Sequence, residues 1–444
     1  MKFYSNLVKK VLSQREPDPS KWEQWTQPNQ LAPVSESACI QTFVSMCEEI
    51  KHNHEKVLVA GDYDCDGILA TTIMVKGLRS FGIECGFYLP DRIVEGYGLS
   101  KATVQSAHSK GYSMIITVDN GVTAFEALQQ AHEYGIKTIV TDHHKIDREV
   151  LCDCLVHPSK MEETFFSLCG AGVAYECIRA LGLDTDYLLE LAAVAGIGDV
   201  MIVKGQTRAH IQQGLALLEK NRETHICSLL DSGIINEENI AFQVVPKLNA
   251  VGRLSNLANV NNVVRYFLSE DYREISSYKN QIVNINNQRK QLSQEMVNFA
   301  QSKIKEHDPL IVIADASFHE GIIGLVAGSV CNQYQKPAII MCKNRDGYKA
   351  SMRSVNGFDC MEFLKEYPHF VQLGGHAQAA GFFLNLQDYE SFIEYLKERI
   401  RTYQWEPEVY SSISVKAEEL TVEEIKSLDL LRPFGPGFEK PLFE

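Results

Sequence analysis

The chain has 444 residues, of which 45% are hydrophobic and 23% charged, and a formal net charge of −14 at pH 7. This length and composition predict a globular protein of two or three domains, and the acidic balance argues against a protein that coats nucleic acid nonspecifically. No apolar run is long enough to span a bilayer, and the N-terminus turns polar too early for a signal peptide. The twelve cysteines have no repeating spacing, which argues against a disulfide framework and favours the cytoplasm.

The first half of the chain alternates short apolar strands with helices. Apolar runs predict strands at 56–60, 114–118 and 137–141, and helical patterns follow at 67–81 and 123–134. Such alternation predicts a parallel sheet that helices cover on both faces. Ligands of such a sheet bind at the carboxyl ends of its strands.

The second half predicts a helical region, a connector and a smaller α/β domain. Residues 160–240 have mostly helical patterns. The long polar helical pattern over 271–307 is typical of a connector between domains, and a coiled-coil helix is the alternative. A second α/β pattern starts at 309–315 and continues through strands at 336–342 and 348–354. The predicted fold class is therefore α/β, with a parallel-sheet domain joined by a long helix to a smaller α/β domain.

These patterns divide the chain into five predicted parts. They are an N-terminal segment (1–50), a first α/β domain (51–265), a connecting helix (266–307), a second α/β domain (308–405) and a C-terminal extension (406–444).

The segment VAGDYDCDGILA (59–70) places three carboxylates at alternate positions directly after a predicted strand: Asp62, Asp64 and Asp66. Like charges this close repel, so a fold tolerates them where a cation neutralises them. An acidic surface turn is the alternative, because Asp and Gly favour turns. Further carboxylates and imidazoles stand at the ends of later predicted elements: Asp119, Asp142, His143, His144 and Asp199.

The composition of this set predicts the kind of metal that it binds. Carboxylates dominate, with one or two imidazoles and no thiolate. Hard oxygen donors favour Mg²⁺ or Mn²⁺ over zinc, and histidine tilts the choice toward Mn²⁺. The set exceeds the needs of one ion, so we expect two ions that share a bridging carboxylate. Two such ions activate a water and stabilise an in-line phosphoryl displacement.

The order of the motifs resembles the DHH phosphoesterases. Its members are DYDCDG (62–67), VDNG (118–121), TDHH (141–144), a glycine-flanked Asp199 and, in the second domain, GGHAQAAG (374–381). Within this superfamily the chain resembles the RecJ family of single-strand-specific 5′→3′ DNA exonucleases. The motifs that carry this second resemblance are PDRIVEGYG (90–98), PKLNAVGRL (246–254), FHEGIIGLVA (318–327), ASMRS (350–354) and LLRPFGPGFEKPLF (430–443).

The resemblance implies a set of metal ligands: Asp62, Asp64, Asp66, Asp119, His143 and Asp199. Asp119 matches the bridging ligand. Asp62 is the natural substitute for a histidine that many relatives have at the position of Ala60. His144 matches the histidine that faces the scissile phosphate, so the expected catalytic residues are His144, Asp119 and Asp64.

The resemblance also implies a set of substrate-binding residues: Arg92, Arg253, Ser351, Arg353, His376, Gly374 and Gly375. Arginine offers a planar fork to phosphate oxygens, and glycine lets backbone amides approach them. For Arg253 and Arg353 the alternative is solvation at the surface. For His376 it is a core histidine whose hydrogen bonds are satisfied.

The resemblance implies an exonuclease with two Mn²⁺ or Mg²⁺ ions that trims single-stranded DNA from its 5′ end and releases 5′-mononucleotides. The expected partner is single-stranded DNA, with a single-strand-binding protein or a helicase as candidate protein partners and no membrane. In the family, the segment LLRPFGPGFEKPLF leads into an OB-fold that grips DNA. We expect that fold to be missing here, with weaker DNA binding as the result.

Two other functions are compatible with the sequence. The first is a DHH phosphodiesterase that acts on short oligonucleotides, cyclic dinucleotides or a nucleotide bisphosphate. The second is a replication scaffold without catalysis, resembling Cdc45. Such scaffolds lose metal ligands, whereas this sequence keeps the full set, which argues against the second alternative.

Overall fold

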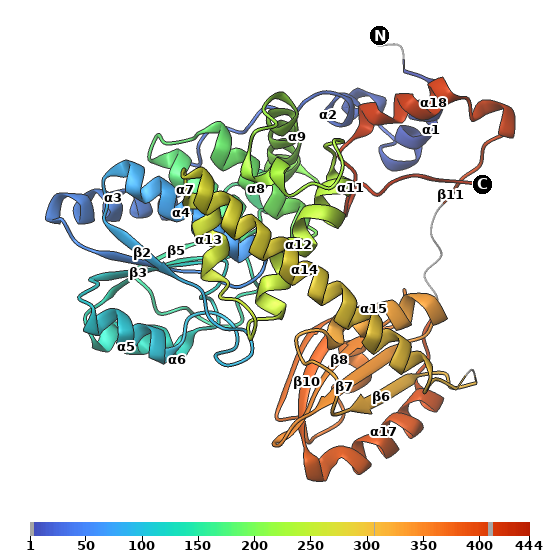
Figure 1. Cartoon of the computed structure of the whole chain (residues 1–444). Coiled ribbons are helices and arrows are strands. Elements are labelled where there is room, and N and C mark those ends of the chain that lie inside the picture. The colour runs from blue at the N-terminus through green and yellow to red at the C-terminus, as the bar shows by residue number, and fades with distance from the viewer. Residues whose placement is uncertain (1–3, 306, 407–411) are drawn as a thin grey trace. The chain divides into compact units, whose positions relative to one another are not determined.

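The computed structural model describes residues 4–305, 307–406 and 412–444. It contains two compact units, one formed by Met1–Ile285 with Ser412–Glu444 and the other by Asn286–Ser411. Figure 1 shows the elements of both units along the chain.

A five-stranded sheet organises the first unit. The strands are β1 (Val57–Ala60), β2 (Cys85–Tyr88), β3 (Met114–Val118), β4 (Lys137–Thr141) and β5 (Cys154–Val156). Their order is β2-β1-β3-β4-β5, and every neighbouring pair is parallel. All residues of β1 and β3 are buried, as expected for strands that are covered on both faces. The predicted parallel sheet is confirmed.

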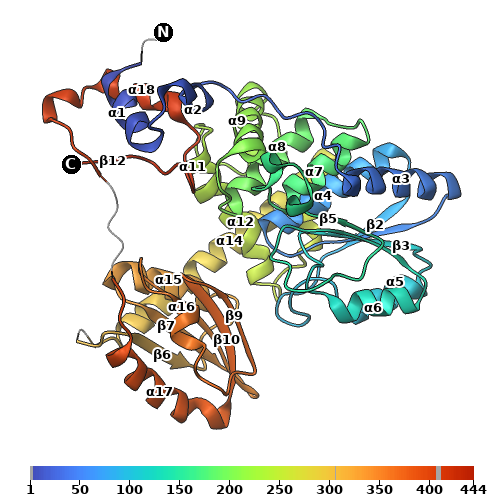
Figure 2. The ribbon, with the colours of Figure 1, turned by 180° about the vertical axis from the view of Figure 1, so that it is seen from behind.

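Helices cover the two faces of this sheet (Figures 1 and 2). One face carries α3 (Ala38–Asn53), α4 (Cys65–Phe81) and α7 (Gly170–Ala180), and the other carries α5 (Lys101–Ser109) and α6 (Phe125–Glu133). Helix α4 is the central helix and is buried along most of its length. Because α4 begins directly after β1, its first turn lies at the carboxyl edge of the sheet.

Further elements complete the first unit: α1 (Asn6–Arg15), α2 (Glu23–Thr26), α8 (Asp186–Gly198), α9 (Gly205–Lys220), α10 (His225–Ser228), α11 (Glu237–Asn239), a π-helix (Ile240–Val244), α12 (Val245–Arg253), α13 (Asn261–Leu268), α18 (Val422–Ser427) and the strand pair β11 (Ser412–Ile413) and β12 (Leu442–Phe443). Short 3₁₀ turns lie at Pro19–Lys21, Pro158–Lys160, Glu163–Phe165, Ala417–Glu419 and Leu428–Leu431. Helix α14 (Tyr272–Gln301) continues from the first unit into the second.

The C-terminal extension packs against the N-terminal segment and α9. The rings of Trp25 and Phe438 stack with their centroids 4.2 Å apart. The buried guanidinium of Arg208 donates hydrogen bonds to the carbonyls of Pro433 and Leu431, both at 2.9 Å. These contacts explain why the extension belongs to the first unit. Residues 407–411 of the predicted extension lie outside the described residues.

The second unit is a smaller α/β domain with a mixed sheet. Its strands are β6 (Ile311–Asp315), β7 (Ala338–Lys343), β8 (Gly347–Arg353), β9 (Gln372–His376) and β10 (Ala379–Asn385), in the order β6-β7-β8-β10-β9. Its helices are α15 (Ile323–Tyr334), α16 (Cys360–Leu364) and α17 (Tyr389–Thr402), with a 3₁₀ turn at Leu386–Asp388. Only β6 and β7 pair in parallel, and the other neighbours are antiparallel.

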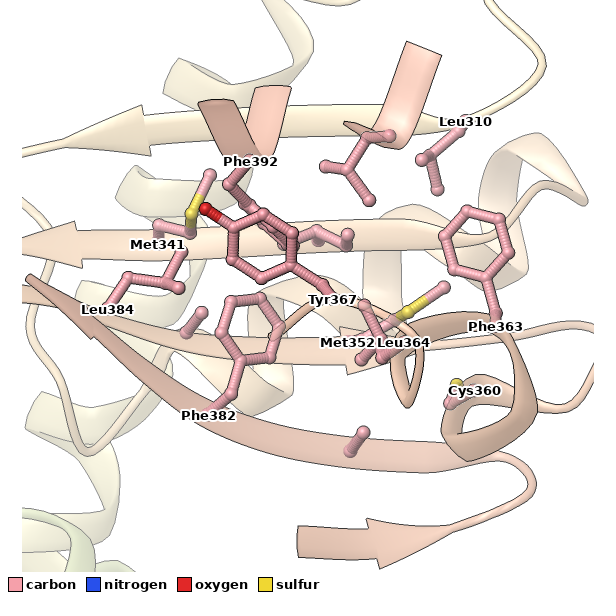
Figure 3. Packing of buried hydrophobic residues seen from close by; sticks show 14 of the residues in the cluster. Leu310, Met341, Met352, Cys360, Phe363, Leu364, Tyr367, Phe382, Leu384 and Phe392 are labelled. Carbon is pink, nitrogen blue, oxygen red and sulfur yellow. The ribbon is translucent and has the colours of Figure 1, made fainter. Parts of the chain in front are cut away.

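An aromatic core holds this second unit together (Figure 3). Phe382 on β10 and Phe392 on α17 lie with ring centroids 5.2 Å apart, and Tyr367 contacts Phe392 at 5.0 Å. Met341 and Met352, on β7 and β8, are fully buried in the same cluster. Burial of such side chains removes large apolar areas from water and is the main source of stability here.

The sequence patterns missed several elements and extended one too far. Strands β2 and β5 have only four and three residues, and such short runs are hard to recognise by periodicity. The helix predicted over 271–307 ends at Gln301. It begins at Tyr272 because Asp271 accepts hydrogen bonds from the amides of Arg273 and Glu274, which caps the helix and separates it from α13.

The described residues show neither a disulfide nor a membrane-spanning helix. All twelve cysteines lie among the described residues, and each is a free thiol, so the expected absence of a disulfide framework is confirmed. Among the described helices, none combines the length and the apolar character that a membrane crossing requires.

Glu190 gives the first unit a testable pH dependence. This α8 residue is 3% exposed, and its Oε2 has no hydrogen-bond partner. Burial and the charge of Asp186 raise the pKa of Glu190 to about 7. Because the folded pKa exceeds the unfolded one, the stability contributed by the protonated group is present below about pH 4.3 and is lost as the pH rises through 7.

We therefore expect Glu190→Gln to become more stable relative to wild type as the pH rises. The difference in unfolding free energy should grow by roughly 3 kcal/mol between pH 4 and pH 8. Urea unfolding of both proteins at several pH values measures it, with the exposed Glu223→Gln as the control. A difference that does not depend on pH would contradict the prediction.

Candidate functional site

The carboxyl edge of the parallel sheet collects the acidic residues. Asp62 and Asp64 follow β1, and Asp64 caps α4 by accepting a hydrogen bond from the amide of Gly67 at 3.1 Å. A side chain at Gly67 would come within 2.6 Å of the backbone of Asp62. Glycine is therefore required for α4 to start this close to the loop, and the close start brings Asp66 into the same cluster.

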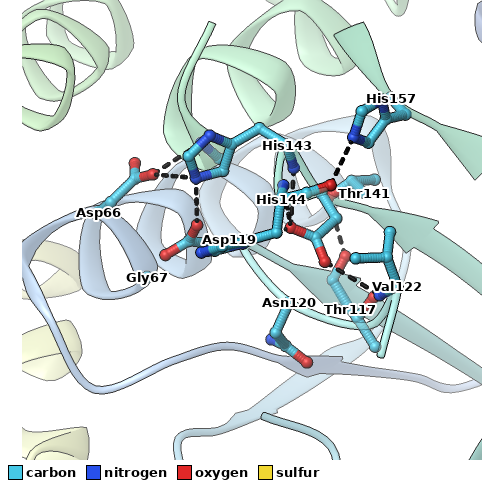
Figure 4. Close-up of polar contacts among 12 residues, drawn as sticks. Asp66, Gly67, Thr117, Asp119, Asn120, Val122, Thr141, His143, His144 and His157 are labelled. Carbon is cyan, nitrogen blue, oxygen red and sulfur yellow. Dashed lines mark hydrogen bonds and ion pairs between the residues drawn. The ribbon is translucent and has the colours of Figure 1, made fainter. Parts of the chain in front are cut away.

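The other predicted ligands and the predicted catalytic residue His144 come from three different elements. Asp119 directly follows β3, and His143 and His144 follow β4. Asp199 is the C-cap of α8. Figure 4 shows Asp66, Asp119 and His143 pointing toward one another. The structure thus brings together residues that lie more than 130 positions apart in the sequence.

The donor atoms form three overlapping groups, each with its atoms within 4.8 Å of one another: Asp66, His143 and Asp199; Asp62, Asp64 and Asp119; and Asp119, His143 and His144. His143 Nε2 lies 3.2 Å from an oxygen of Asp119, 3.5 Å from one of Asp199 and 3.8 Å from one of Asp66. Asp119 therefore belongs both to a group of carboxylates and to a group with imidazoles, which is the arrangement of a bridging ligand.

Buried carboxylates concentrate negative charge in this cluster, and a bound cation would stabilise them. Burial, together with neighbouring carboxylates, raises the pKa of Asp62 and of Asp119 well above the ordinary value. The same causes raise the pKa of Asp199 to about 8. Burial lowers the pKa of His143, so this imidazole does not supply the missing positive charge.

The unsatisfied atoms of the cluster fit a divalent metal. One oxygen each of Asp62 and Asp119, and Nε2 of His143, are buried without a hydrogen-bond partner. Buried polar atoms normally have partners, so such a concentration of exceptions requires an explanation. Carboxylate oxygens with one or two imidazoles are donors that suit Mn²⁺ and Mg²⁺. The residues present therefore fit these ions.

Backbone amides hold Asp66 in place. At the start of α7, the amide of Gly170 donates to one oxygen of Asp66 at 2.7 Å, and the amide of Ala171 donates to the other at 2.8 Å. The N-terminus of a helix stabilises a negative charge. Each oxygen of Asp66 also keeps a second lone pair for a metal ion.

Asp142 positions His144. One oxygen of Asp142 accepts hydrogen bonds from the amides of His143 and His144 and contacts His144 Nδ1 at 2.8 Å. The other oxygen accepts from the amide of Val122. Burial works against the charged imidazole of His144, but its bond to Asp142 and the charge of that residue outweigh burial and raise the pKa of His144.

Two predicted substrate-binding arginines belong to the same unit as the acidic cluster. Arg92 lies 5.0 Å over the ring of Tyr63, the residue between Asp62 and Asp64. Arg253 ends α12. This helix packs on the same loop, because Asn249 accepts a hydrogen bond from the amide of Cys65 at 2.6 Å.

The remaining predicted substrate-binding residues lie in the second unit. Arg353 donates a hydrogen bond to the hydroxyl of Ser351 at 2.9 Å. A side chain at Gly324, in the first turn of α15, would come within 3.1 Å of the guanidinium. His376 is exposed at the end of β9, so the alternative of a core histidine is wrong. The glycines that precede it, Gly374 and Gly375, are exposed as well.

Sequence reasoning missed two residues that contact the cluster. Tyr97 donates a hydrogen bond to the carbonyl of Asp119 at 2.8 Å, and Gly170 allows α7 to approach, since a side chain there would lie 2.4 Å from Cβ of Asp119. Tyr97 stands inside the motif PDRIVEGYG, which was a signal that could have found it. Gly170 has no comparable signal.

Comparisons with known proteins agree with this geometry. Residues 56–197 match the model of the DHH family, N-terminal domain, and residues 307–402 match that of the DHHA1 domain. The chain is 33% identical over 409 residues to the single-stranded-DNA-specific exonuclease RecJ of Bacillus subtilis, with 87% of this chain and 51% of that protein covered. The chain thus spans about half the length of that relative.

Solved structures of RecJ are similar as well. The structure of RecJ from Thermus thermophilus in complex with Mn²⁺ matches with a TM-score of 0.87 and 25% identity, over 99% of this chain and 66% of that one. A structure of exonuclease RecJ bound to manganese matches with a TM-score of 0.72 and 27% identity, over 85% of this chain and 97% of that one. The chain is a RecJ-like member of the DHH family, with a DHH domain followed by a DHHA1 domain.

Proposed function

We propose that this chain is a metal-dependent 5′→3′ exonuclease that hydrolyses single-stranded DNA and releases 5′-mononucleotides. The observation that carries the proposal is the set of three overlapping donor groups, two of which share Asp119. The names of the relatives support the substrate, and the manganese-bound structures support the metal. Cytoplasmic location, and a single-strand-binding protein or a helicase as partner, stay predictions.

The proposed ligands of two ions are the residues that the sequence indicates: Asp62, Asp64, Asp66, Asp119, His143 and Asp199. When bound, divalent ions supply positive charge that activates a water and stabilises phosphate oxygens. The chain itself holds the ligand Asp66 and the ring of His144 in fixed positions. The amides of α7 hold Asp66, and Asp142 holds the ring of His144 through Nδ1. His144 can then present its other nitrogen to an oxygen of the scissile phosphate.

The second unit supplies a proposed anchor for substrate phosphates. Arg353, Ser351 and the first turn of α15 lie together, and a guanidinium beside a helix N-terminus is suited to bind phosphate. His376 stands two strands away, since Arg353 and His376 both pair with Ala379 on β10. Their backbones are therefore about 10 Å apart across the sheet.

Arg353→Gln should weaken substrate binding more than it slows hydrolysis. An anchor away from the reacting atoms stabilises ground and transition states alike, so KM should rise about 10- to 100-fold while kcat changes little. Steady-state kinetics on a labelled oligonucleotide measures both constants. Arg345→Gln, which removes the same charge from an exposed turn of the same unit, is the control. A collapse of kcat at unchanged KM would show that Arg353 acts on the transition state instead.

The experiment that tests the proposed function is digestion of end-labelled oligonucleotides of graded length in the presence of Mn²⁺. We expect long single strands to lose a 5′ label first, as a mononucleotide, and blunt duplexes to resist. Activity confined to oligomers of a few residues, or to cyclic dinucleotides or a nucleotide bisphosphate, would favour the alternative phosphodiesterase. Single-strand binding without any hydrolysis would favour the Cdc45-like scaffold.

A further inference from the structure

Asp119 has a backbone conformation that an aspartate rarely adopts. Its φ is +58°, in the left-handed region where few residues other than glycine occur. Such a conformation persists only where its surroundings hold it, and it is often found at functional sites. The direction of the Asp119 carboxylate therefore depends on an unfavourable backbone conformation, which neighbouring groups must stabilise.

Two hydrogen bonds hold this backbone. The amide of Asp119 donates to the carbonyl of Thr141 on β4 at 3.0 Å. Its carbonyl accepts a hydrogen bond from the hydroxyl of Tyr97 at 2.8 Å. The first bond comes from the sheet, but the second comes from one side chain on the loop between β2 and α5.

The loop that carries Tyr97 is itself fixed to the residue after Asp119. The amide of Leu99 donates to the side-chain oxygen of Asn120 at 3.1 Å. The amide group of that side chain donates to the carbonyls of Ala60 at 3.0 Å and Val118 at 2.9 Å. A side chain at Gly98, whose φ is +72°, would come within 3.3 Å of Asn120. The loop that carries Tyr97 is thus connected to β1 and β3 by hydrogen bonds through Asn120.

The same hydroxyl lies beside the second predicted catalytic group. It is 3.2 Å from Nδ1 and 3.4 Å from Nε2 of His144, and the two rings meet edge to face. The proton of the hydroxyl goes to the carbonyl of Asp119, so the hydroxyl does not donate to the imidazole. Tyr97 therefore joins Asp119 and His144 through one oxygen atom, although its side chain is 45% exposed.

We propose that Tyr97 is a positioning residue whose hydroxyl holds the left-handed backbone of Asp119 and thereby aims the shared carboxylate at divalent ions. This inference rests on the proposed metal centre but not on the nature of the substrate. Outer partners of metal ligands typically change metal affinity 10- to 100-fold when they are removed. Loss of the Tyr97 hydroxyl should lower the metal affinity by about 10-fold, the lower end of that range. The hydrogen bond from the amide of Asp119 to the carbonyl of Thr141 remains.

The test compares Mn²⁺ binding by Tyr97→Phe, Tyr88→Phe and wild type, measured by calorimetry and by electron paramagnetic resonance. Tyr88 is the matched control, because its hydroxyl bonds to Glu95 in the same loop at 2.5 Å but does not reach Asp119. We expect Tyr97→Phe to bind Mn²⁺ about 10-fold more weakly and Tyr88→Phe to bind it as wild type does. Excess Mn²⁺ should restore the kcat of Tyr97→Phe, with KM for DNA unchanged.

Three results would overturn the inference. One is an affinity of Tyr97→Phe within twofold of wild type, and another is an equal loss in Tyr88→Phe, which would indicate general loop order instead. The third is a further loss of Mn²⁺ affinity when Tyr97→Phe is added to Asp119→Asn, since the hydroxyl should act only through that carboxylate. Failure of the wild-type chain to bind Mn²⁺ would instead remove the proposed function, so the two failures are distinguishable.

Discussion

Asp119→Asn is expected to lower the rate of hydrolysis by about 10³-fold while the chain stays folded. The substitution removes the charge that two of the three donor groups share. Asparagine is preferable to alanine here, because it keeps the size of the side chain and tolerates the left-handed backbone at φ +58°. Mn²⁺-dependent hydrolysis of a labelled single strand measures the loss.

The same variant should be more stable than wild type in metal-free buffer. Burial and the neighbouring carboxylates raise the pKa of Asp119, so a neutral amide relieves repulsion that the ions would otherwise offset. A thermal melt in EDTA measures this, with Asp147→Asn in an exposed loop as the control. If the variant kept more than about a tenth of the wild-type rate, its activity would be far above the expected residual rate. That result would contradict the assignment of Asp119 as the bridging ligand.

Gly170→Ala should cost at least about 10-fold in Mn²⁺ affinity and about 10²-fold in rate. The new Cβ would lie 2.4 Å from Cβ and 2.7 Å from Cα of Asp119, so α7 or Asp119 must move. Movement of α7 would also disturb the amide of Gly170, which bonds to Asp66. Two predicted ligands are therefore displaced by a single methyl group.

Gly172→Ala is the matched control for this substitution. It lies in the same helix, but its Cβ would meet the side chain of Leu168, at 3.0 Å from Cδ2, and alanine is a better helix former than glycine. Calorimetric Mn²⁺ titration of both variants separates the effects. If Gly170→Ala and Gly172→Ala bind Mn²⁺ equally well, the approach of α7 does not set the geometry of the ligands.

The gathering of the acidic residues could be predicted from the sequence, because it depends on a simple rule. The apolar runs before Asp62, Asp119 and Asp142 predict parallel strands, and the ends of such strands meet at one edge of a sheet. Chemical reasoning on the donor types then leads to hard divalent ions. The strands β1, β3 and β4 end where the runs predict.

The supporting contacts could not be predicted in the same way. Gly170 matters because α7 crosses Asp119, a residue 51 positions earlier, and no periodicity reports such a crossing. The hydroxyl of Tyr97 reaches Asp119 from a loop whose path depends on Asn120. Strands β2 and β5 pair with their neighbours despite their short runs, because tertiary contact overrides weak local preference.

The most direct test of the metal centre is a calorimetric titration of the wild-type chain with Mn²⁺. The melting temperature of the chain is then measured at each Mn²⁺ concentration. We predict about two ions per chain, as a bridged site requires, and a melting temperature that rises with Mn²⁺ as ligand linkage demands. The second ion should be lost in Asp119→Asn. If no Mn²⁺ bound, or if the melting temperature did not change with Mn²⁺, the result would contradict the conclusion that metal charge allows these carboxylates to lie together.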